Sequence, residues 1–493
     1  MKHNILHFIN NQFVPSQGGQ TFEILTPLTN EVIGVCASGQ PADVDRAVLA
    51  AGAAFASGVW SKMPVRERAR RVRLIADLIL KHAAEIAELE IEDTGIPRRQ
   101  ITKGAIPRAA DNFYFFADQI QYLPGEAYQV DDEWINYTTY RPVGVAGLIT
   151  PWNTPFMLET WKVAPALASG NTAILKPAEW SPLSANKLAE IIQEADLPPG
   201  VFNVVHGYGE TAGAPLVAHP GVHLISFTGE TTTGQIIIKN GADTLKRYSM
   251  ELGGKSPNLV FADADLERAL DGSLWQIYSL NGERCTAASR LLVERSIYDR
   301  FVEQLAERVR KIKIGDPNDM NTEIGPLIHL EHWQRVRNYM DVARDEGATI
   351  LVGGDRPTSD SSFVKGNYFS PTLITNVHNR MRIAQEEIFG PVLVVMPFDN
   401  EEQAVSLAND VRYGLAGYVW TGDTARAHRV AAQLDCGMVW INSHNVRDLR
   451  TPFGGSKFSG IGREGGSLSF TEFYMDVKTV HVPLGNHHIP KKG

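Results

Sequence analysis

A cysteine and a glutamate in glycine-rich settings carry the clearest chemistry in this sequence. Cys285 lies in Asn281-Gly282-Glu283-Arg284-Cys285-Thr286, and Glu251 lies 34 residues upstream in Met250-Glu251-Leu252-Gly253-Gly254-Lys255. Glycine lets the backbone turn sharply and approach a ligand closely. A thiol held in such a turn can attack a carbonyl carbon, and a nearby carboxylate can activate water to release the product. The two residues therefore predict a nucleophile and a general base.

The neighbours of the two residues bear on their pKa values. Arg284 places a cation beside Cys285, and Thr286-Ala287-Ala288 is compatible with the start of a helix; both features favour a thiolate. Glu283 adds a negative charge beside the thiol, so the pKa of Cys285 stays open. The apolar and glycine-rich neighbours of Glu251 predict a raised carboxyl pKa, which suits a base near neutral pH. Taken alone, however, a lone cysteine is often a small buried apolar side chain, as we expect of Cys36 and Cys436. A lone glutamate is most often a surface charge.

The bulk composition restricts the class of protein. A chain of 493 residues is too long for one ordinary core, so two or three domains are expected. The formal net charge of -9 argues against a nucleic-acid binder. Three cysteines without Cys-x-x-Cys spacing exclude a disulfide framework and predict no structural metal site. We find no signal peptide and no apolar run that approaches the roughly 18 residues of a membrane span, so a reducing, cytoplasmic location is expected.

The hydrophobic pattern predicts an α/β protein. Helical spacing of apolar residues covers 42–56 and a longer segment, 66–91. Short apolar strands then alternate with helices, and this order predicts parallel pairs in α/β sheets. The expected strands are 143–149, 171–175, 201–205, 223–227, and, in a second unit that begins near Gly254, 258–261, 289–293, 391–396 and 438–442. The expected helices between them include 107–119, 161–168 and 297–312.

Seven short motifs occur in one order along the chain. They are Pro151-Trp152-Asn153-Thr154-Pro155, Leu175-Lys176-Pro177-Ala178-Glu179, Phe227-Thr228-Gly229, Glu251-Leu252-Gly253-Gly254-Lys255, Cys285, Glu387-Ile388-Phe389-Gly390-Pro391 and Pro452-Phe453-Gly454-Gly455. Any one of them could arise by chance, but together and in this order they resemble the aldehyde dehydrogenase superfamily. The resemblance covers nearly the whole chain.

The resemblance implies an aldehyde dehydrogenase-like fold with two Rossmann-like parallel-sheet domains and a β-stranded oligomerisation arm. An NAD-binding domain is expected in residues 1–120 and 142–253, and a catalytic domain in 254–453. The arm and the C-terminal segment would take 121–141 and 454–493.

Two segments rich in tyrosine, threonine and valine are expected to form edge strands of this arm. They are 136–140 and 471–483. By resemblance the arm is shared between the subunits of a homodimer or homotetramer. The residues alone equally allow ordinary hairpin strands.

The resemblance also implies roles for three catalytic residues. Cys285 would attack the aldehyde, Asn153 and the backbone N–H of Cys285 would stabilise the oxyanion, and Glu251 would activate water to hydrolyse a thioester. Such a base speaks against a relative that passes the thioester to coenzyme A. Without the resemblance, Asn153 between two prolines reads as a turn asparagine.

Further motif residues are implied to bind the cofactor. Lys176 and Glu179, one helical turn apart, resemble a ribose-binding pair, and a carboxylate there favours NAD over NADP. The alternative is a surface ion pair. The segment from Gly229 to Gly234 would hold the pyrophosphate at a helix start, although Glu230 is an unusual carboxylate there that either points to solvent or loosens diphosphate binding. The remaining implied cofactor residues are Ile149, Trp152, Glu387 and Phe389.

The substrate is inferred from arginines. Arg284 and Arg447 match positions that line the aldehyde tunnel of the family, and Arg108 in the helix 107–119 is a further candidate. Arginine binds carboxylates through two hydrogen bonds, so these residues suit a dicarboxylate semialdehyde. Alternatively the arginines are solvated or pair with Asp448 and Glu283.

One branch of the superfamily fits this inference. Residues 281–286, Asn445-Val446-Arg447-Asp448-Leu449-Arg450 and the tail His487-His488-Ile489-Pro490-Lys491 resemble the 5-carboxymethyl-2-hydroxymuconate semialdehyde dehydrogenases, which serve 4-hydroxyphenylacetate catabolism. Two alternatives remain open: a dehydrogenase of another semialdehyde or aromatic aldehyde, and an inactive binding or structural relative.

Overall fold

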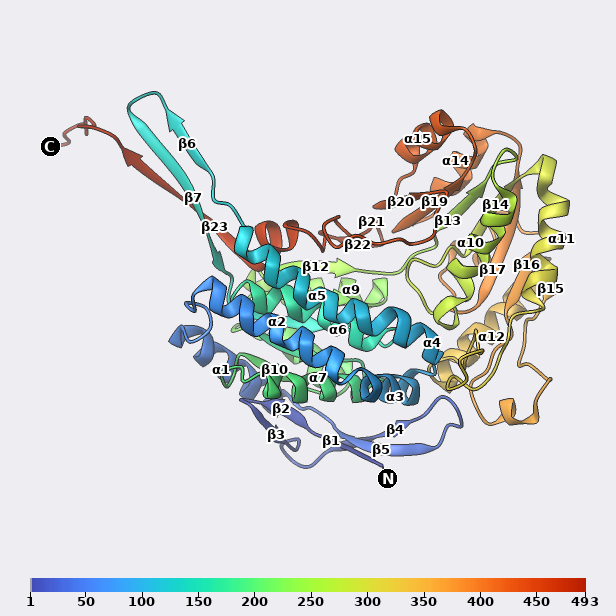
Figure 1. Cartoon of the computed structure of the whole chain (residues 1–493), viewed down its shortest axis with the longest axis horizontal. Helices are drawn as coiled ribbons and strands as arrows, with labels where there is room; N and C mark the ends of the chain where they lie inside the picture. Colours follow the sequence, from blue (N-terminus) through green and yellow to red (C-terminus); the bar gives the residue numbers. More distant parts are fainter. Residues whose placement is uncertain (1) are drawn as a thin grey trace.

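The protein is built around two large twisted sheets that form separate lobes (Figure 1). The computed structural model describes residues 2–493, with the side chain of Ser362 excepted. The first sheet has eight strands, in the spatial order β22 (Gly460–Ile461), β12 (Arg247–Glu251), β11 (Leu224–Thr228), β8 (Val145–Ile149), β9 (Thr172–Lys176), β10 (Phe202–Val204), β2 (His7–Ile9) and β3 (Gln12–Val14). The central five strands are parallel, and the edge strands are antiparallel.

The second sheet has seven strands and repeats this plan. Its order is β15 (Thr349–Val352), β16 (Thr372–Thr375), β17 (Val392–Phe398), β14 (Arg290–Glu294), β13 (Pro257–Val260), β19 (Ala416–Trp420) and β20 (Met438–Ile441). All neighbours are parallel except β15 and β16. The expected α/β fold with two parallel sheets is confirmed, because each expected strand from 143 onwards coincides with an observed one to within a few residues.

In each sheet the chain adds strands first on one side of a central strand and then on its other side. In the first sheet β8 lies between β9 and β11, and in the second β13 lies between β14 and β19. The loops after strands on the two sides of such a point diverge and leave a crevice at the carboxyl ends of the strands. The first sheet therefore offers a ligand crevice beside Ile149, Lys176 and Thr228, the last residues of β8, β9 and β11.

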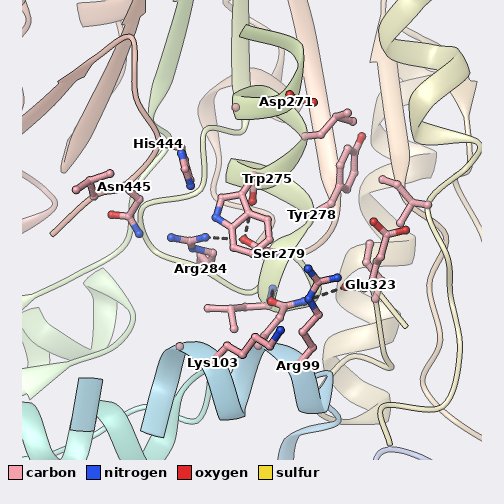
Figure 2. Close-up of a pocket in the computed structure, with 18 of the residues that line it drawn as sticks. Arg99, Lys103, Asp271, Trp275, Tyr278, Ser279, Arg284, Glu323, His444 and Asn445 are labelled. Atoms are coloured by element: carbon pink, nitrogen blue, oxygen red, sulfur yellow. Dashed lines mark hydrogen bonds between the residues drawn. The ribbon is translucent and has the colours of Figure 1, made fainter. Parts of the chain in front are cut away.

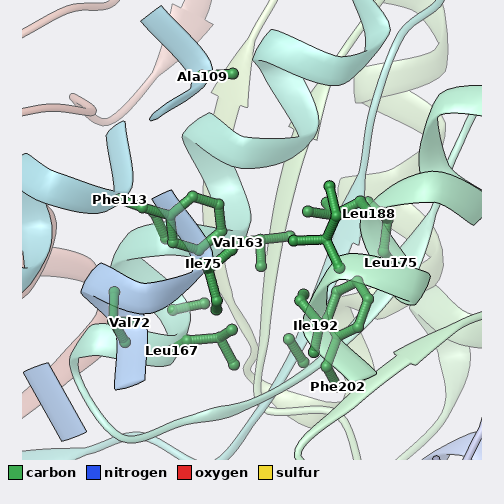
Figure 3. Packing of buried hydrophobic residues seen from close by; sticks show 14 of the residues in the cluster. Val72, Ile75, Ala109, Phe113, Val163, Leu167, Leu175, Leu188, Ile192 and Phe202 are labelled. Atoms are coloured by element: carbon green, nitrogen blue, oxygen red, sulfur yellow. The ribbon is translucent and has the colours of Figure 1, made fainter. Parts of the chain in front are cut away.

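Helices cover both sheets. The first lobe carries α1 (Pro41–Ser57), α2 (Val65–Lys81), α3 (Ala83–Thr94), α5 (Ile106–Gln119), α6 (Pro155–Ala168), α7 (Pro182–Glu194), α8 (Ala214–Ala218) and α9 (Thr231–Gly241). The second carries α10 (Leu266–Tyr278), α11 (Tyr298–Val309), α12 (Leu330–Asp345), α14 (Glu401–Asn409) and α15 (Thr424–Gln433). In the largest core, Phe113 from α5 packs with Ile75 from α2 and Val163 from α6 (Figure 3).

The helix expected over 66–91 is wrong in one respect, because the chain breaks at His82. That residue ends α2 and begins α3, and its imidazole lies 2.7 Å from Glu194 of α7. α2 packs mainly on α5, whereas α3 packs mainly on α7, so the two segments have different main partners. The apolar spacing continues through the break and does not reveal it.

A third, three-stranded antiparallel sheet extends away from the first lobe (Figure 1). It consists of β6 (Ala127–Val130), β7 (Trp134–Pro142) and β23 (Met475–Pro483). This confirms the separate β arm, although residues 471–474, expected as strand, belong to a π-helical turn instead. The smaller sheets are β1 (His3–Ile5), β5 (Val32–Ala37) and β4 (Thr21–Leu25), and the pair β18 (Tyr413–Gly414) and β21 (Ser456–Lys457). The domain boundaries given above stay predictions.

No helix among residues 2–493 combines the length and apolar character that a membrane crossing requires.

Phe113→Ala tests the core between α2, α5 and α6. Phe113 has no exposed surface, so its truncation leaves a cavity and should lower the free energy of unfolding by about 3–5 kcal/mol. Urea unfolding followed by tryptophan fluorescence measures the change. As a control, Leu49→Ala in α1 alters a side chain that is 62% exposed and should change stability by less than about 0.5 kcal/mol. Equal losses in both variants would contradict this assignment of the core.

Candidate active site

The two lobes meet where the carboxyl edge of the first sheet faces the amino edge of the second. Glu251 is the last residue of β12, at the strand end and not in a loop as its neighbours suggest. Glu387 precedes β17 of the other sheet, and its carboxylate accepts a 2.9 Å hydrogen bond from the N–H of Gly254. A Cβ at Gly253 would lie 2.0 Å from the same carboxylate, so only glycine permits this approach.

Cys285 is held by a turn of unusual backbone conformation. Leu280, Asn281 and Gly282 all have positive φ, at +52°, +56° and +78°. A Cβ at Gly282 would lie 2.3 Å from the nitrogen of Pro391. The Asn281 side chain fixes the turn, because its oxygen accepts from Gly325 N–H at 2.8 Å and its amide donates to Pro326 O at 2.9 Å. Sparsely populated conformations of this kind persist where the surroundings define them strongly.

The expectation of a helix after Cys285 is wrong. Cys285 and Thr286 lie in a turn, and no helix begins before β14 starts at Arg290. The pKa of the thiol, which the sequence leaves open, is raised. The thiol is partly accessible, but its burial raises the pKa to about 11, and the nearby carboxylates Glu387 and Glu251 act in the same direction. The cations of Arg284 and Arg447 oppose this shift and are outweighed.

Asn153 lies beside the turn that carries Cys285. It sits between β8 and α6, is 8% exposed, and donates from Nδ2 to the carbonyl of Glu283 at 2.8 Å. This bond ties the amide to the peptide two residues before the thiol. One amide hydrogen is used and the second is left to donate elsewhere.

Glu251 is buried at the same junction. Neither of its carboxylate oxygens has a hydrogen-bond partner among residues 2–493. Burial raises its pKa well above the ordinary value, the charge of Glu464 adds to the rise, and Lys162 opposes it. The expected raised pKa is therefore confirmed in direction. A carboxyl group in this state is suited to accept a proton near neutral pH.

Sequence reasoning missed the polar network behind Glu251. Lys162 Nζ is fully buried and donates to Glu464 Oε1 at 2.9 Å and to Ser226 Oγ at 2.8 Å. Trp161 Nε1 donates to the other oxygen of Glu464. A lysine within the otherwise apolar run 161–168 was the signal that could have indicated this pair, because a buried lysine requires a partner.

Glu283 does not hold Arg284, contrary to one alternative above. Its carboxylate accepts from Ile328 N–H at 3.0 Å and lies 3.6 Å from His332 Nε2. Arg284 instead donates to Ser279 Oγ at 2.5 Å. Burial raises the pKa of Glu283 well above its usual range, which favours the neutral acid beside the thiol.

The predicted cofactor residues line the crevice of the first sheet. Ile149 and Lys176 end β8 and β9, and Lys176 Nζ lies 3.3 Å from Glu179 Oε2. Lys176 thus belongs to β9 and Glu179 to the loop that follows, so the pair is not on a helix as expected. Gly229 follows β11 directly, and Gly234 lies in the first turn of α9, whose N-terminus adjoins the crevice.

Two details of this crevice bear on whether it can bind a dinucleotide. Glu230 is exposed to solvent, which is one of the two alternatives raised by its charge. On the other side, Trp152 and Phe389 lie with ring centroids 5.3 Å apart, next to Glu387. Phe389 has a φ of +63°, a strained value for an aromatic residue. A helix N-terminus, a carboxylate near a lysine and two aromatic faces fit a phosphate-, ribose- and ring-containing ligand.

Arg447 and Arg108 share one aromatic partner. Each guanidinium carbon lies 5.6 Å from the ring centroid of Trp161, and Arg447 also lies 3.8 Å from that of Phe453. Neither arginine forms an ion pair with a residue from 2 to 493. Burial lowers the pKa of Arg447 to about 10, and the like charge of Arg108 adds to this effect.

Arg450 behaves differently from the other loop arginine. It is exposed and paired with Asp448, so the solvated alternative holds for this residue alone. Asp448 is thereby unavailable to neutralise Arg447.

A cavity of about 1250 Å³ opens beside these residues (Figure 2). Its lining includes Arg284 and Thr154, the chain neighbours of Cys285 and Asn153, and Arg108. It therefore leads from the surface toward the predicted nucleophile. Figure 2 shows Arg284 pointing toward Ser279, with Arg99 and Lys103 on the helical segment across the opening.

Comparison with known proteins identifies the family. Residues 13–480 match the aldehyde dehydrogenase family. The chain is 51% identical over 94% of its length to the 5-carboxymethyl-2-hydroxymuconate semialdehyde dehydrogenase of Escherichia coli, and it covers 98% of that protein. This chain belongs to the aldehyde dehydrogenase family. The family is one of NAD(P)-dependent oxidoreductases, so the expected enzyme class is confirmed.

Two solved structures agree with this assignment of an aldehyde dehydrogenase. HpcC from Thermus thermophilus is 55% identical, with a TM-score of 0.97, and the match covers 100% of this chain and 95% of that one. The NAD+ complex of an aldehyde dehydrogenase from Bacillus cereus is 42% identical, with a TM-score of 0.95 over 98% of this chain and 97% of that one. The expected fold is therefore confirmed.

Alkylation of Cys285 tests the raised thiol pKa of this aldehyde dehydrogenase. With a pKa of about 11, the thiolate fraction should rise about tenfold per pH unit between about pH 7 and 9. The rate of iodoacetamide labelling of the Cys285 peptide, measured by mass spectrometry in the free protein, should follow this rise. Cys285→Ser, which keeps Cys36 and Cys436, is the control. A rate that levels off by about pH 8 would show that the cations dominate instead.

Proposed function

We propose that this aldehyde dehydrogenase uses NAD to oxidise 5-carboxymethyl-2-hydroxymuconate semialdehyde, a dicarboxylate, in 4-hydroxyphenylacetate catabolism in the cytoplasm. The observation that carries the substrate class is the pair Arg108 and Arg447. Two guanidinium groups on one indole, without a carboxylate partner, are electrostatically unfavourable unless an anion joins them. A substrate carboxylate that accepts from both would relieve this repulsion.

Cys285 is the proposed nucleophile. The thiol first loses its proton to water; the thiolate sulfur then adds to the aldehyde carbon, and the carbonyl oxygen becomes an oxyanion. Burial keeps the free thiol mostly protonated at neutral pH, while the positive side chains of Arg284 and Arg447 favour the thiolate. The left-handed turn at 280–282 holds the sulfur in place, so little ordering is required when the substrate arrives.

Asn153 is the proposed oxyanion donor, together with the backbone N–H of Cys285. Its bond to the carbonyl of Glu283 fixes the amide before the reaction begins. Donors that are already oriented stabilise developing charge without reorganisation, and loss of one typically slows catalysis by about 10²–10³-fold.

The chemistry that bound NAD would supply is the acceptance of a hydride from the sulfur adduct, which would leave a thioester. Lys176 and Glu179 would hold a ribose, the segment from Gly229 to Gly234 the pyrophosphate, and Glu387, Phe389, Trp152 and Ile149 the nicotinamide end. The Glu179 carboxylate would accept from a 2′-hydroxyl and repel a 2′-phosphate, which favours NAD over NADP.

Glu251 is the proposed base for the last step. Its buried carboxylate takes a proton from water, the hydroxide attacks the thioester carbon, and the carboxylic acid leaves as the thiol is restored. Glu251 is buried, and the charges of Glu464 and Lys162 act on its pKa in opposite directions.

We further propose that the arm of β6, β7 and β23 joins subunits into a homodimer or homotetramer. Its exposed side chains include Tyr128, Val130, Tyr137 and Val477.

Glu251→Gln separates the two halves of this chemistry. The amide cannot take the proton from water, so steady-state turnover should fall about 10²–10⁴-fold. One NADH per active site should still form in a rapid burst, since the thiol and the oxyanion donor remain. Stopped-flow absorbance at the NADH band measures both phases, and wild-type protein provides the reference. Unaltered steady-state turnover would rule out Glu251 as the base.

Arg447→Gln tests the substrate class. It should lower kcat/KM for the carboxylated semialdehyde about 10–100-fold, because charge-assisted hydrogen bonds are lost. The effect on an uncharged aldehyde should be several-fold smaller. Arg450→Gln, three residues further along the same loop and paired with Asp448 at the surface, is the matched control and should behave as wild type. Equal rates of the wild type on charged and uncharged aldehydes would instead favour another semialdehyde or aromatic aldehyde.

A further inference from the structure

Arg284 is a partly buried cation without an anionic partner. Its guanidinium donates to the hydroxyl of Ser279, and it forms no ion pair with the described part of the chain. The neighbouring carboxylate, Glu283, is directed to Ile328 and His332. A guanidinium removed from water without a counter-ion is costly, which indicates that an anion completes this site when the protein is working.

The cavity that Arg284 lines is strongly basic. Arg99, Lys103, Arg108, Arg268, Arg308 and Lys311 line it with Arg284, against only two acidic residues, Asp271 and Glu323. Arg308 is neutralised by Asp271, but Arg99 and Lys103 have no ion-pair partner among residues 2–493. In a chain of net charge -9, a basic opening of this kind concentrates anions at the entrance.

Arg284 is separate from the pair Arg108 and Arg447. That pair packs on Trp161 and comes from α5 and from the loop after β20. Arg284 comes from the nucleophile's own turn and points toward Ser279, at the end of α10 (Figure 2). His444, also in the cavity lining, has a pKa lowered by partial burial and by the charge of Arg284; a neutral imidazole can still donate to an anion.

We propose that Arg284, assisted by Ser279 and His444, forms a second anion subsite that binds a carboxylate attached close to the aldehyde carbon of the substrate. This inference rests on the proposed function and adds that different arginines bind the two carboxylates of the substrate. Arg108 and Arg447 bind the carboxylate at the far end of the substrate chain, and Arg284 binds the second one. The enzyme then selects semialdehydes with two carboxylates over those with one.

The proposed substrate has two carboxylates at the required positions. In 5-carboxymethyl-2-hydroxymuconate semialdehyde, one carboxylate ends the six-carbon chain opposite the aldehyde, and the carboxymethyl group sits on the carbon next to the aldehyde carbon. Arg284 is the chain neighbour of Cys285, so its side chain starts next to the sulfur that binds the aldehyde carbon. 2-Hydroxymuconic semialdehyde lacks only the carboxymethyl group and is therefore a matched comparison substrate.

A competing role for Arg284 is purely electrostatic, since its charge lowers the pKa of the Cys285 thiol. Loss of that effect would slow every aldehyde to the same degree. The ratio of kcat/KM for the two muconic semialdehydes cancels this contribution, whereas loss of a second anion subsite changes the ratio.

The test is to measure this ratio in wild type, Arg284→Gln, Arg284→Lys and Arg447→Gln, with an uncharged aldehyde as a further substrate. Wild type should prefer the carboxymethyl compound, and Arg284→Gln should reduce the ratio at least about tenfold. Arg284→Lys should recover part of it, because the charge is kept without the planar fork. Arg447→Gln should slow both muconic substrates and leave their ratio nearly unchanged. Arg450→Gln is again the matched control.

The outcomes separate the two proposals. A wild-type ratio near one, or a ratio unchanged in Arg284→Gln while that variant still oxidises the uncharged aldehyde, overturns the second anion subsite and leaves the proposed function intact. If neither muconic substrate is oxidised faster than the uncharged aldehyde by wild type, the proposed substrate class itself fails. If Arg284→Gln is inactive on every aldehyde, the ratio measured in Arg284→Lys decides, and an unchanged ratio there also overturns the subsite.

Discussion

Contact between backbone segments at the junction of the two sheets is the constraint on which the site depends. Three glycines at this junction lie so close to a neighbouring group that a side chain at their positions would not fit. A Cβ would lie 2.0 Å from the Glu387 carboxylate at Gly253, 2.5 Å from the carbonyl of Cys285 at Gly254, and 2.3 Å from Pro391 N at Gly282. Because the backbones pack this closely, the thiol from one sheet and the carboxylate of Glu251 from the other share one small volume. A larger residue at these glycines would separate the catalytic groups before it affected either sheet.

The same closeness determines the electrostatics. Burial is the largest cause of the raised pKa values of Cys285, Glu251, Glu283 and Glu387, and it exceeds the effect of any nearby charge. Burial therefore shifts all four groups toward their protonated forms in the absence of ligands. Cations are present as well, but those closest to Cys285 are themselves partly stripped of water. Proton positions at this junction are set more by packing than by ion pairs.

The arginines show how such a site becomes selective. A cation held away from water and without a partner remains available to a ligand, whereas Arg450, only three residues from Arg447, is neutralised by Asp448 at the surface. Trp161 and Phe453 support Arg447 through their ring faces, and Ser279 supports Arg284 through one hydrogen bond. These uncharged partners orient the guanidinium groups without satisfying their charge. A tunnel that binds anions requires guanidinium groups that are held in place but whose charge is not neutralised by the protein.

The amino-acid sequence by itself determined the α/β pattern, the order of the strands along the chain and the residues of the motifs. The spacing of apolar residues and the residue types in turns are properties of short segments, so they can be read without the tertiary structure. The sequence could not determine the break at His82, since the apolar spacing runs through it and the two segments pack mainly on different helices. It left the pKa direction of Cys285 open, because an adjacent cation and an adjacent carboxylate are visible in the sequence and burial is not. It also missed the Lys162–Glu464 pair, whose members lie 302 positions apart in the chain. Motifs are local, but desolvation and pairing depend on which distant segments meet, and only the tertiary structure decides that.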